Sequence, residues 1–290
     1  MIDITTLIMT ILSASTPLLF AALGELMAER AGVLNLGVEG MMITGALAGF
    51  AAAHATGNPL LGFVAAALAG AAISMIFGVL TQFLLTNQVA TGLALTLFGL
   101  GLTALFGKPY EGVKAPSMAA GPLGLHWIIW LGLLMVPLSW WFLNRTRGGL
   151  ILRGIGENHD AAHALGHKVR LVRLAAVAFG GAMAGIGGAY ISIATVLQWT
   201  EGMTAGAGWI ALALVVFSGW RAFGVMAGAW LFGGVTVMQL RLQAAGVNLP
   251  VQLLAMAPYL ATIIALVVIS ARRRGSAAPG SLGRIFHTTN

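Results

Sequence analysis

The sequence contains no cysteine and very little charge. Without cysteine the chain forms no disulfide and offers no thiolate metal ligand. Asp, Glu, Lys and Arg together make up 8% of the residues, about a third of their share in soluble domains. Hydrophobic residues make up 59%, and the mean hydropathy is +0.93. Because so few charges cannot cover a soluble fold, the composition predicts an integral membrane protein.

Common catalytic motifs are absent as well. The chain has no glycine-rich phosphate loop with its lysine, no nucleophile elbow and no HExxH pair. Without a phosphate loop, the chain itself is not expected to hydrolyse ATP. An intramembrane enzyme is disfavoured, because a paired acid, a metal-ligand set and a nucleophile–base pair are all missing. We predict that the chain is not an enzyme and carries no cofactor.

The sequence does contain a series of long apolar runs. A helix that crosses a bilayer needs about 20 mostly apolar residues, and nine runs meet or approach this length. We therefore predict an all-α, polytopic transmembrane helix bundle with about nine spans, within a range of eight to ten. The run at 207–220 is short and is consistent with a broken or re-entrant helix. The runs lie near 5–23, 33–53, 59–83, 89–107, 126–144, 171–197, 207–220, 222–240 and 250–270.

The domain organisation follows from these runs. The gaps between them are too short for a soluble domain, so residues 1–274 are predicted to form a single transmembrane domain. Residues 275–290 are predicted to be a short, disordered cytoplasmic tail. "GALAGFAAAH" (45–54) aligns without gaps to "GAMAGIGGAY" (181–190). Transporters often contain internal repeats, but chance explains this similarity equally well in a chain so rich in Ala and Gly.

The positions of Lys and Arg predict the orientation. With the 145–173 loop in the cytoplasm, twelve of these fifteen residues lie inside, and only Lys108, Lys114 and Arg241 lie outside. The positive-inside rule strongly favours this arrangement, which puts the N-terminus outside and the C-terminus inside. The net charge of +7 then reflects membrane topology. No nucleic-acid partner is predicted, because the basic residues cluster in particular loops.

The 145–173 loop contains a stretch with helix signals, "ENHDAAHALG". Asn158 is a good N-cap, Asp160 lies in the first turn, and Gly166 suits the C-terminal stop. A two-turn helix is marginal alone in water, so we expect it to dock on its own bundle or on a partner. A small face with charge at its edge would fit a shallow groove on a partner. This face comprises Ala161, Ala162 and Leu165, with Glu157 and Asp160 at the edge.

Three histidines in the same loop, His159, His163 and His167, are spaced four residues apart and could share a helical face. A metal site is one interpretation, since imidazole is a common zinc ligand. A solvated face is the other, because His167 lies beyond the Gly166 stop and no carboxylate completes a ligand set at helical spacing. We favour surface histidines and predict no metal site.

Several polar residues fall in or beside the apolar runs, where they usually face a bundle interior or a water-filled path. Asn35 and Glu39 of "GVLNLGVEG" are four residues apart, so on one helix they would share a face. Lining of a translocation path and hydrogen bonding between helices explain this pair about equally well. The further candidates for the path are Asn87, Gln88, Thr91 and Thr204.

Two other patterns are interpreted as structural. Glu25 and Glu29 are predicted to lie at the wet, cytoplasmic end of the first helix. Small residues four apart, Gly181 with Gly185 and Ala184 with Gly188, are predicted to allow close packing of helices.

The stretch "GELMAERAGVLNLGVEGMMITGALAGF" (24–50) resembles the signature of permease subunits of bacterial ABC importers for nucleosides and simple sugars. These belong to a larger group that includes ribose and branched-chain amino acid permeases. The similarity continues through "TNQVATGLALTLFGLGL" (86–102) and "RTRGGLILRGIGENHDAAHALGHKVRLVRLAAVAFGGAMAGIGGAY" (145–190). It resumes at "MTAGAGWIALALVVFSGW" (203–220) and "LQAAGVNLPVQLLAMAPYLATIIALVV" (242–268). The resemblance covers most of the chain in the right order.

The resemblance implies a multi-pass subunit in the bacterial cytoplasmic (inner) membrane. Its partners would be a second, homologous permease, two ATPase subunits that bind ATP and Mg²⁺, an extracytoplasmic binding protein and membrane lipid. The "NLGVEG" form tilts the expected solute toward nucleosides. The loop containing "GEN…ALG" looks like the segment that docks on the ATPase, although His159 stands where relatives commonly carry Pro. The residues assigned to coupling are Glu157, Asn158, Asp160, Ala161, Ala162, Leu165 and Gly166.

An ion-coupled secondary transporter or channel remains the alternative. Glu39 would then serve as the proton site, and uptake would depend on pH and proceed without ATP.

Overall fold

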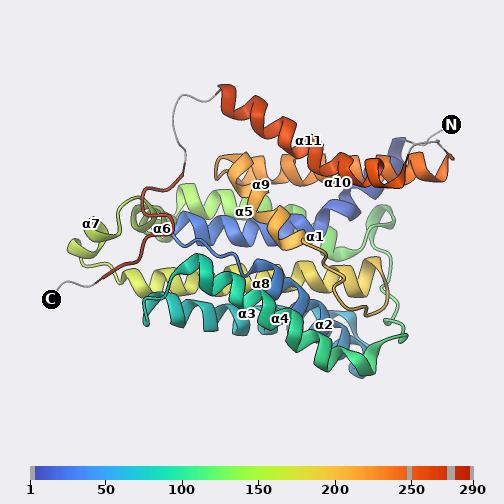
Figure 1. Cartoon of the computed structure of the whole chain (residues 1–290), viewed down its shortest axis with the longest axis horizontal. Helices are drawn as coiled ribbons and strands as arrows, with labels where there is room; N and C mark the ends of the chain where they lie inside the picture. Colours follow the sequence, from blue (N-terminus) through green and yellow to red (C-terminus); the bar gives the residue numbers. More distant parts are fainter. Residues whose placement is uncertain (1–3, 247–249, 273–277, 288–290) are drawn as a thin grey trace.

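Helices run side by side along one long axis of the molecule (Figure 1). The computed structural model describes residues 4–246, 250–272 and 278–287, and over these ranges it contains eleven α-helices and no strand. This confirms the all-α prediction. The helices are α1 (Ile4–Arg30), α2 (Val38–Thr56), α3 (Pro59–Gln82), α4 (Gln88–Gly107), α5 (Trp127–Arg145), α6 (Arg147–Glu157), α7 (His159–Ala164), α8 (Val169–Ala189), α9 (Ala207–Ser218), α10 (Ala222–Ala244) and α11 (Val251–Arg272).

Six helices in the described part of the chain are long and apolar enough to cross a membrane: α1, α3, α4, α5, α8 with its π-helical extension Tyr190–Thr195, and α10. Each of the nine predicted runs overlaps a helix, but the count of nine spans is not confirmed. The short run at 207–220 forms the short helix α9. The 12 residues of α9 extend about 18 Å, against a hydrocarbon core of about 30 Å.

The most tightly packed part of the bundle is formed by α1, α2, α3 and α8. Small residues on α8 let the neighbouring backbones approach closely. A Cβ at Gly185 would clash with the carbonyl oxygen of Ala66 on α3, and one at Gly188 would clash with that of Met42 on α2. The predicted packing role of these small residues is confirmed. Gly45 of α2 also lies against Gly185, so the two similar segments touch, and their shared small residues have a packing reason.

The turn between α2 and α3 illustrates how local sequence sets helix ends. Gly57 adopts φ +66°, the left-handed conformation that ends a helix at little steric cost. Asn58 Oδ1 then accepts a hydrogen bond from Leu60 N at 2.9 Å. Pro59 occupies the first position of α3, where its missing N–H costs nothing. The four residues TGNP (56–59) therefore end α2, reverse the chain direction and begin α3, with glycine at the left-handed position, asparagine at the N-cap and proline at the first helical position.

The 145–173 segment holds more structure than we predicted. Besides the expected short helix it contains α6, which Thr146 caps by accepting a hydrogen bond from Gly149 N at 3.0 Å. One side of α6 is buried through Leu152 and Ile155. Figure 1 shows α6, α7 and the C-terminal segment together at one end of the bundle.

The C-terminal segment corrects a second expectation. Residues 278–287, predicted to be disordered, pack on the bundle and form what we call the C-terminal strap. Ser281 N donates to Gly156 O at 2.8 Å, and Gly283 N donates to Gly32 O at 3.2 Å. The predicted boundary at 274/275 and the arginines 273–274 lie outside the described residues. The strap therefore joins the α1–α2 loop to the end of α6.

Candidate functional site

The α7 helix has the cap and the stop that its sequence predicts. Asn158 Oδ1 accepts hydrogen bonds from Asp160 N at 3.1 Å and Ala161 N at 3.0 Å. Gly166 adopts φ +86° just after the helix. These contacts fix both ends of a helix that has only six residues.

One side of α7 faces the bundle, and the other faces outward. Ala162 is buried against Ile155 and Val169, so it is not part of an outward face, contrary to our expectation. Leu165 is 79% exposed, a high value for a leucine. We call the outward side the docking face, and it comprises the exposed residues Glu157, Asn158, Asp160, Ala161 and Leu165.

The C-terminal strap holds α7 against the bundle. The buried ring of Phe286 packs edge-on against the rings of His159 and His163, with centroids 5.4 and 5.2 Å apart. Ser281 Oγ accepts a hydrogen bond from His159 N at 3.2 Å. Because the strap occupies the inward side of α7, the orientation of the docking face depends on it.

Arg173 connects the strap, α7 and the α1–α2 loop. Its side chain is fully buried, and it donates to Ala31 O and to Arg284 O, each at 3.1 Å. A third contact, also 3.1 Å, joins Nη2 to Nδ1 of His159. Burial, and then the charge of Arg173, lower the pKa of His159 below its ordinary value. Sequence reasoning missed this arginine, although an arginine within an apolar run was a signal.

The three loop histidines differ in environment. His159 is buried, so the prediction of a surface histidine is wrong for it, whereas His163 is exposed and His167 is partly buried. No group of three His, Cys, Asp or Glu side chains that could hold a metal ion occurs in the described ranges.

Asn35 does not share a helix face with Glu39, because α2 begins only at Val38. It lies in a non-helical loop, where its Oδ1 accepts a hydrogen bond from Gly37 N at 2.9 Å. Its own N–H donates to Glu25 Oε1 at 3.2 Å. Gln88 Oε1 accepts from Leu34 N at 2.8 Å. Polar side chains thus satisfy backbone groups that lie inside the bundle, away from water.

Glu39 lies where the first turns of α2 and α9 meet. Its Oε1 accepts hydrogen bonds from the Thr204 hydroxyl and from Gly206 N, the latter at 3.0 Å. Its Oε2 accepts from Gly208 N at 2.7 Å. The carboxylate therefore caps α9 and also stands near the positive end of α2, both favourable places for negative charge. We call Glu39, Thr204, Gly206 and Gly208 the Glu39 cluster.

Glu25 and Glu29 are buried, not wet as predicted. Glu29 Oε2 accepts a hydrogen bond from Trp220 Nε1. Arg30 donates through Nε and Nη2 to Trp220 O at 3.0 and 2.6 Å. Trp220 thus ties the end of α1 to the α9–α10 turn, a link that sequence reasoning missed because the partners are 190 residues apart.

The other path candidates have local roles. Asn87, which is exposed, caps α4 by accepting from Ala90 N at 3.0 Å. The hydroxyls of Thr91 and Thr86 are 2.8 Å apart. None of the six candidates lines the three cavities that we describe in the bundle. Their role in a path stays a prediction.

The fold and this arrangement define a multi-pass integral membrane protein with a structured loop and an outward-facing short helix at one end. Residues 7–271 match the family described as branched-chain amino acid transport system / permease component. The chain belongs to this permease family, and with its six apolar helices it is a multi-pass protein of the cytoplasmic (inner) membrane.

Relatives of known description agree with this assignment. The chain is 40% identical to a putative glucose ABC transporter permease protein, TsgC13, of Haloferax volcanii, over 87% of this chain and 88% of the relative. It is 30% identical to the guanosine ABC transporter permease protein NupQ of Bacillus subtilis, over 92% of each chain. It is 31% identical to the nucleoside ABC transporter permease protein NupC of Lactococcus lactis, again over 92% of each. No solved structure matches the chain.

Proposed function

We propose that the chain is the transmembrane subunit of an ABC importer for a small polar solute, a nucleoside or a simple sugar. The observation that carries this proposal is the docking face on and beside α7, which presents an exposed leucine and two carboxylates while the strap packs on the inward side of the helix. The family match supports it. The named solutes of the relatives, glucose, guanosine and nucleosides, support the solute class.

ATP hydrolysis belongs to a partner in this proposal. ATP and Mg²⁺ bind to two ATPase subunits, whose closure moves the docking face and switches access to the path. A second, homologous permease and an extracytoplasmic binding protein complete the assembly. The ligand favours one state of the path only to the extent that it binds that state better.

The proposed topology has nine spans, with the N-terminus outside and the docking face inside. The distribution of Lys and Arg supports this orientation. The contacts of the strap with α6 and α7 also support it, since they put the C-terminal segment at the same end as the docking face.

An ion-coupled transporter with Glu39 as its proton site is less well supported. Both carboxylate oxygens of Glu39 already accept hydrogen bonds, and the residue is 3% exposed. A proton carrier needs access to water on at least one side, which this buried cap lacks.

Co-purification tests the proposal. We expect the wild-type chain, expressed with its neighbouring transport components, to retain an ATPase subunit. The double variant Glu157→Arg, Leu165→Arg should lose the ATPase, because it adds bulk and reverses charge on the docking face. Leu123→Arg is the control, since Leu123 is 65% exposed but lies in the loop proposed to be outside. Transport by an assembly that contains no ATPase would refute the proposal.

The solute class has a separate test. Binding of nucleosides, simple sugars and amino acids by the cognate binding protein should show affinity for one of the first two classes. Preference for amino acids would refute the proposed solute while leaving the ATPase assembly intact.

A further inference from the structure

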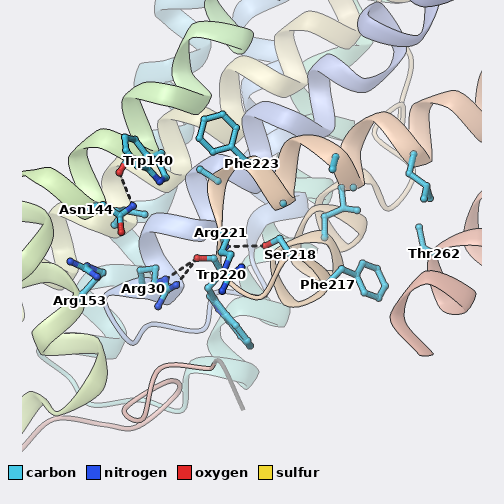
Figure 2. A pocket seen from close by; sticks show the side chains of 17 residues that line it. Arg30, Trp140, Asn144, Arg153, Phe217, Ser218, Trp220, Arg221, Phe223 and Thr262 are labelled. Atoms are coloured by element: carbon cyan, nitrogen blue, oxygen red, sulfur yellow. Dashed lines mark hydrogen bonds between the residues drawn. The ribbon is translucent and has the colours of Figure 1, made fainter. Parts of the chain in front are cut away.

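A cavity of about 810 Å³ lies where the end of α1 meets α5, α6 and the α9–α10 turn. Three arginines line it, namely Arg30 from α1, Arg153 from α6 and Arg221 at the start of α10. Figure 2 shows their side chains around one end of the cavity, beside Trp220 and Asn144. This end of the cavity is at the same end of the bundle as the docking face, which is the proposed cytoplasmic side.

The three arginines of this cavity have no acidic partner within ion-pair distance in the described part of the chain. Arg30 donates only to a backbone oxygen, that of Trp220, in the hydrogen bonds described for it. The buried Nε of Arg153 has no hydrogen-bond partner. A guanidinium group with unused donors binds well to an anion that has several acceptor oxygens.

The carboxylates nearest the cavity make hydrogen bonds to other groups. Glu29 accepts a hydrogen bond from the indole of Trp220. Glu157 accepts one from Gly280 N of the strap at 3.3 Å. Neither carboxylate pairs with the three arginines, which leaves guanidinium donors available to an anion from outside the chain.

From the arginines the cavity continues as an apolar groove along α10. Its wall is formed by Phe223, Gly224, Ala227, Gly228 and Leu231. These positions recur on one side of the helix and span about 12 Å of its length. Ala227 has a single methyl group, and Gly224 and Gly228 bring α10 close to Ser218 and Leu214 of α9, which also line the cavity.

The groove is bordered by aromatic side chains that face the surroundings. Trp140 of α5 and Phe223 of α10 have ring centroids 6.3 Å apart, and they are 39% and 48% exposed. Tryptophan is enriched at the boundary between headgroups and hydrocarbon. The groove thus opens toward the lipid at the depth where headgroups begin.

We propose that this cavity binds an anionic phospholipid of the cytoplasmic leaflet. The arginines bind its phosphate, and one acyl chain lies along the α10 groove. The choice of leaflet rests on the orientation in the proposed function. The transported solute is a poorer occupant, because an uncharged nucleoside or sugar would not neutralise three arginines. A free phosphate ion would leave the apolar groove unused. Basic pockets between helices on the cytoplasmic side suit such headgroups.

The test measures lipid that stays bound to the purified, full-length chain. The protein is exchanged into detergent with equal amounts of phosphatidylglycerol and phosphatidylcholine, and bound lipid is counted by native mass spectrometry. We expect the wild type to retain phosphatidylglycerol. The variant Arg153→Gln, Arg221→Gln should retain about tenfold less, since each lost guanidinium removes charge-assisted hydrogen bonds.

Matched controls separate the headgroup from the groove. Arg145→Gln, Arg147→Gln removes two exposed arginines of the same loop that do not line the cavity, and should leave retention unchanged. Ala227→Trp fills the groove and should also lower retention, whereas Leu97→Trp, on the exposed side of α4, should not.

Three outcomes would overturn the proposal. One is equal phosphatidylglycerol retention by the Arg153, Arg221 variant and the wild type. Another is equal retention of phosphatidylcholine and phosphatidylglycerol by the wild type. The third is displacement of the lipid by about 10 mM inorganic phosphate, which would identify a free-anion site instead. Because neither ATPase nor transport enters the assay, a failure of the proposed function would not change its result.

Discussion

The Glu39 cluster and the docking face both contain carboxylates, but those of the first region are buried and those of the second are exposed. In the Glu39 cluster a buried carboxylate accepts hydrogen bonds from three donors of the chain itself. On the docking face Glu157 and Asp160 are exposed, beside a leucine that is left uncovered. The first arrangement holds two helices together. The second leaves carboxylates and a leucine side chain accessible to a partner.

The free-energy cost of burying a carboxylate explains why the two regions differ. A buried carboxylate is tolerated only when donors replace its lost water. Once those donors are supplied, removing the carboxylate leaves them unpaired, so the cluster becomes necessary for the fold. An exposed carboxylate keeps its water and contributes little to folding. Substitutions in the two regions should therefore separate stability from assembly.

The largest effect should follow Glu39→Leu. This change leaves the Thr204 hydroxyl and two backbone N–H groups buried without an acceptor, at a cost of about 4 kcal/mol in the free energy of unfolding. Reversible unfolding of the detergent-solubilised chain measures this quantity. Thr204→Val is the matched comparison, since it removes a single donor and should cost about 1 kcal/mol. Normal stability of Glu39→Leu would show that the cluster is not structural.

A smaller and more local effect should follow Phe286→Ala. The truncation removes the ring that packs on α7 and should weaken strap docking by about 2 kcal/mol, less than in a fully enclosed core. Hydrogen exchange of α7 should accelerate, while exchange in α3 and α8 stays slow. His287→Ala, an exposed neighbour, should leave α7 unchanged. An unaltered α7 in Phe286→Ala would mean that the docking face is held without the strap.

The sequence predicted the parts of this comparison that depend on local signals. Nine apolar runs correspond to helices, and Asn158 with Gly166 delimits α7 as expected. These features follow from periodicity, capping and φ preference, which act over a few residues. The α6 helix was missed although its cap at Thr146 is equally local, because the segment was treated as a loop.

The parts that the sequence did not predict depend on distant partners. Glu25 and Glu29 were expected to contact water because they lie near the predicted cytoplasmic end of the first helix. Glu29 is buried, and its Oε2 accepts a hydrogen bond from Trp220, 191 residues away. The helical spacing of Asn35 and Glu39 was misleading, because the hydrogen bond from Gly37 N to Asn35 Oδ1 favours a turn there. The same applies to the strap, whose contacts lie more than 100 residues away.

A weak effect of pH should appear at the inner side of α7. Burial and the charge of Arg173, followed by Arg284, act on His159, while Asp160 opposes them, and the net result is a pKa below 6.5. The unfolded chain then binds more protons than the folded chain between that lowered pKa and 6.5. Docking of α7 should be fully stable above pH 6.5 and weaken as pH falls through this window.

Limited proteolysis of the α7 region at pH 7.5 and 5.5 measures this change. His159→Gln should abolish the pH dependence, and His163→Gln, at an exposed position, should retain it. A pH dependence that persists in His159→Gln would place the titrating group at another residue.

The smallest effect on folding should come from Leu165→Arg. This residue is 79% exposed, so the free energy of unfolding should change by less than about 0.5 kcal/mol, as is usual for surface positions. Unfolding of the isolated chain measures that value, and co-purification of the ATPase measures the loss of partner binding in the same variant. If Leu165→Arg is stable but does not bind the ATPase, while Glu39→Leu is destabilised, the two polar regions have different roles. Destabilisation by Leu165→Arg would instead show that α7 packs on the bundle through its outward side, because a charge is costly only where it displaces buried apolar contacts.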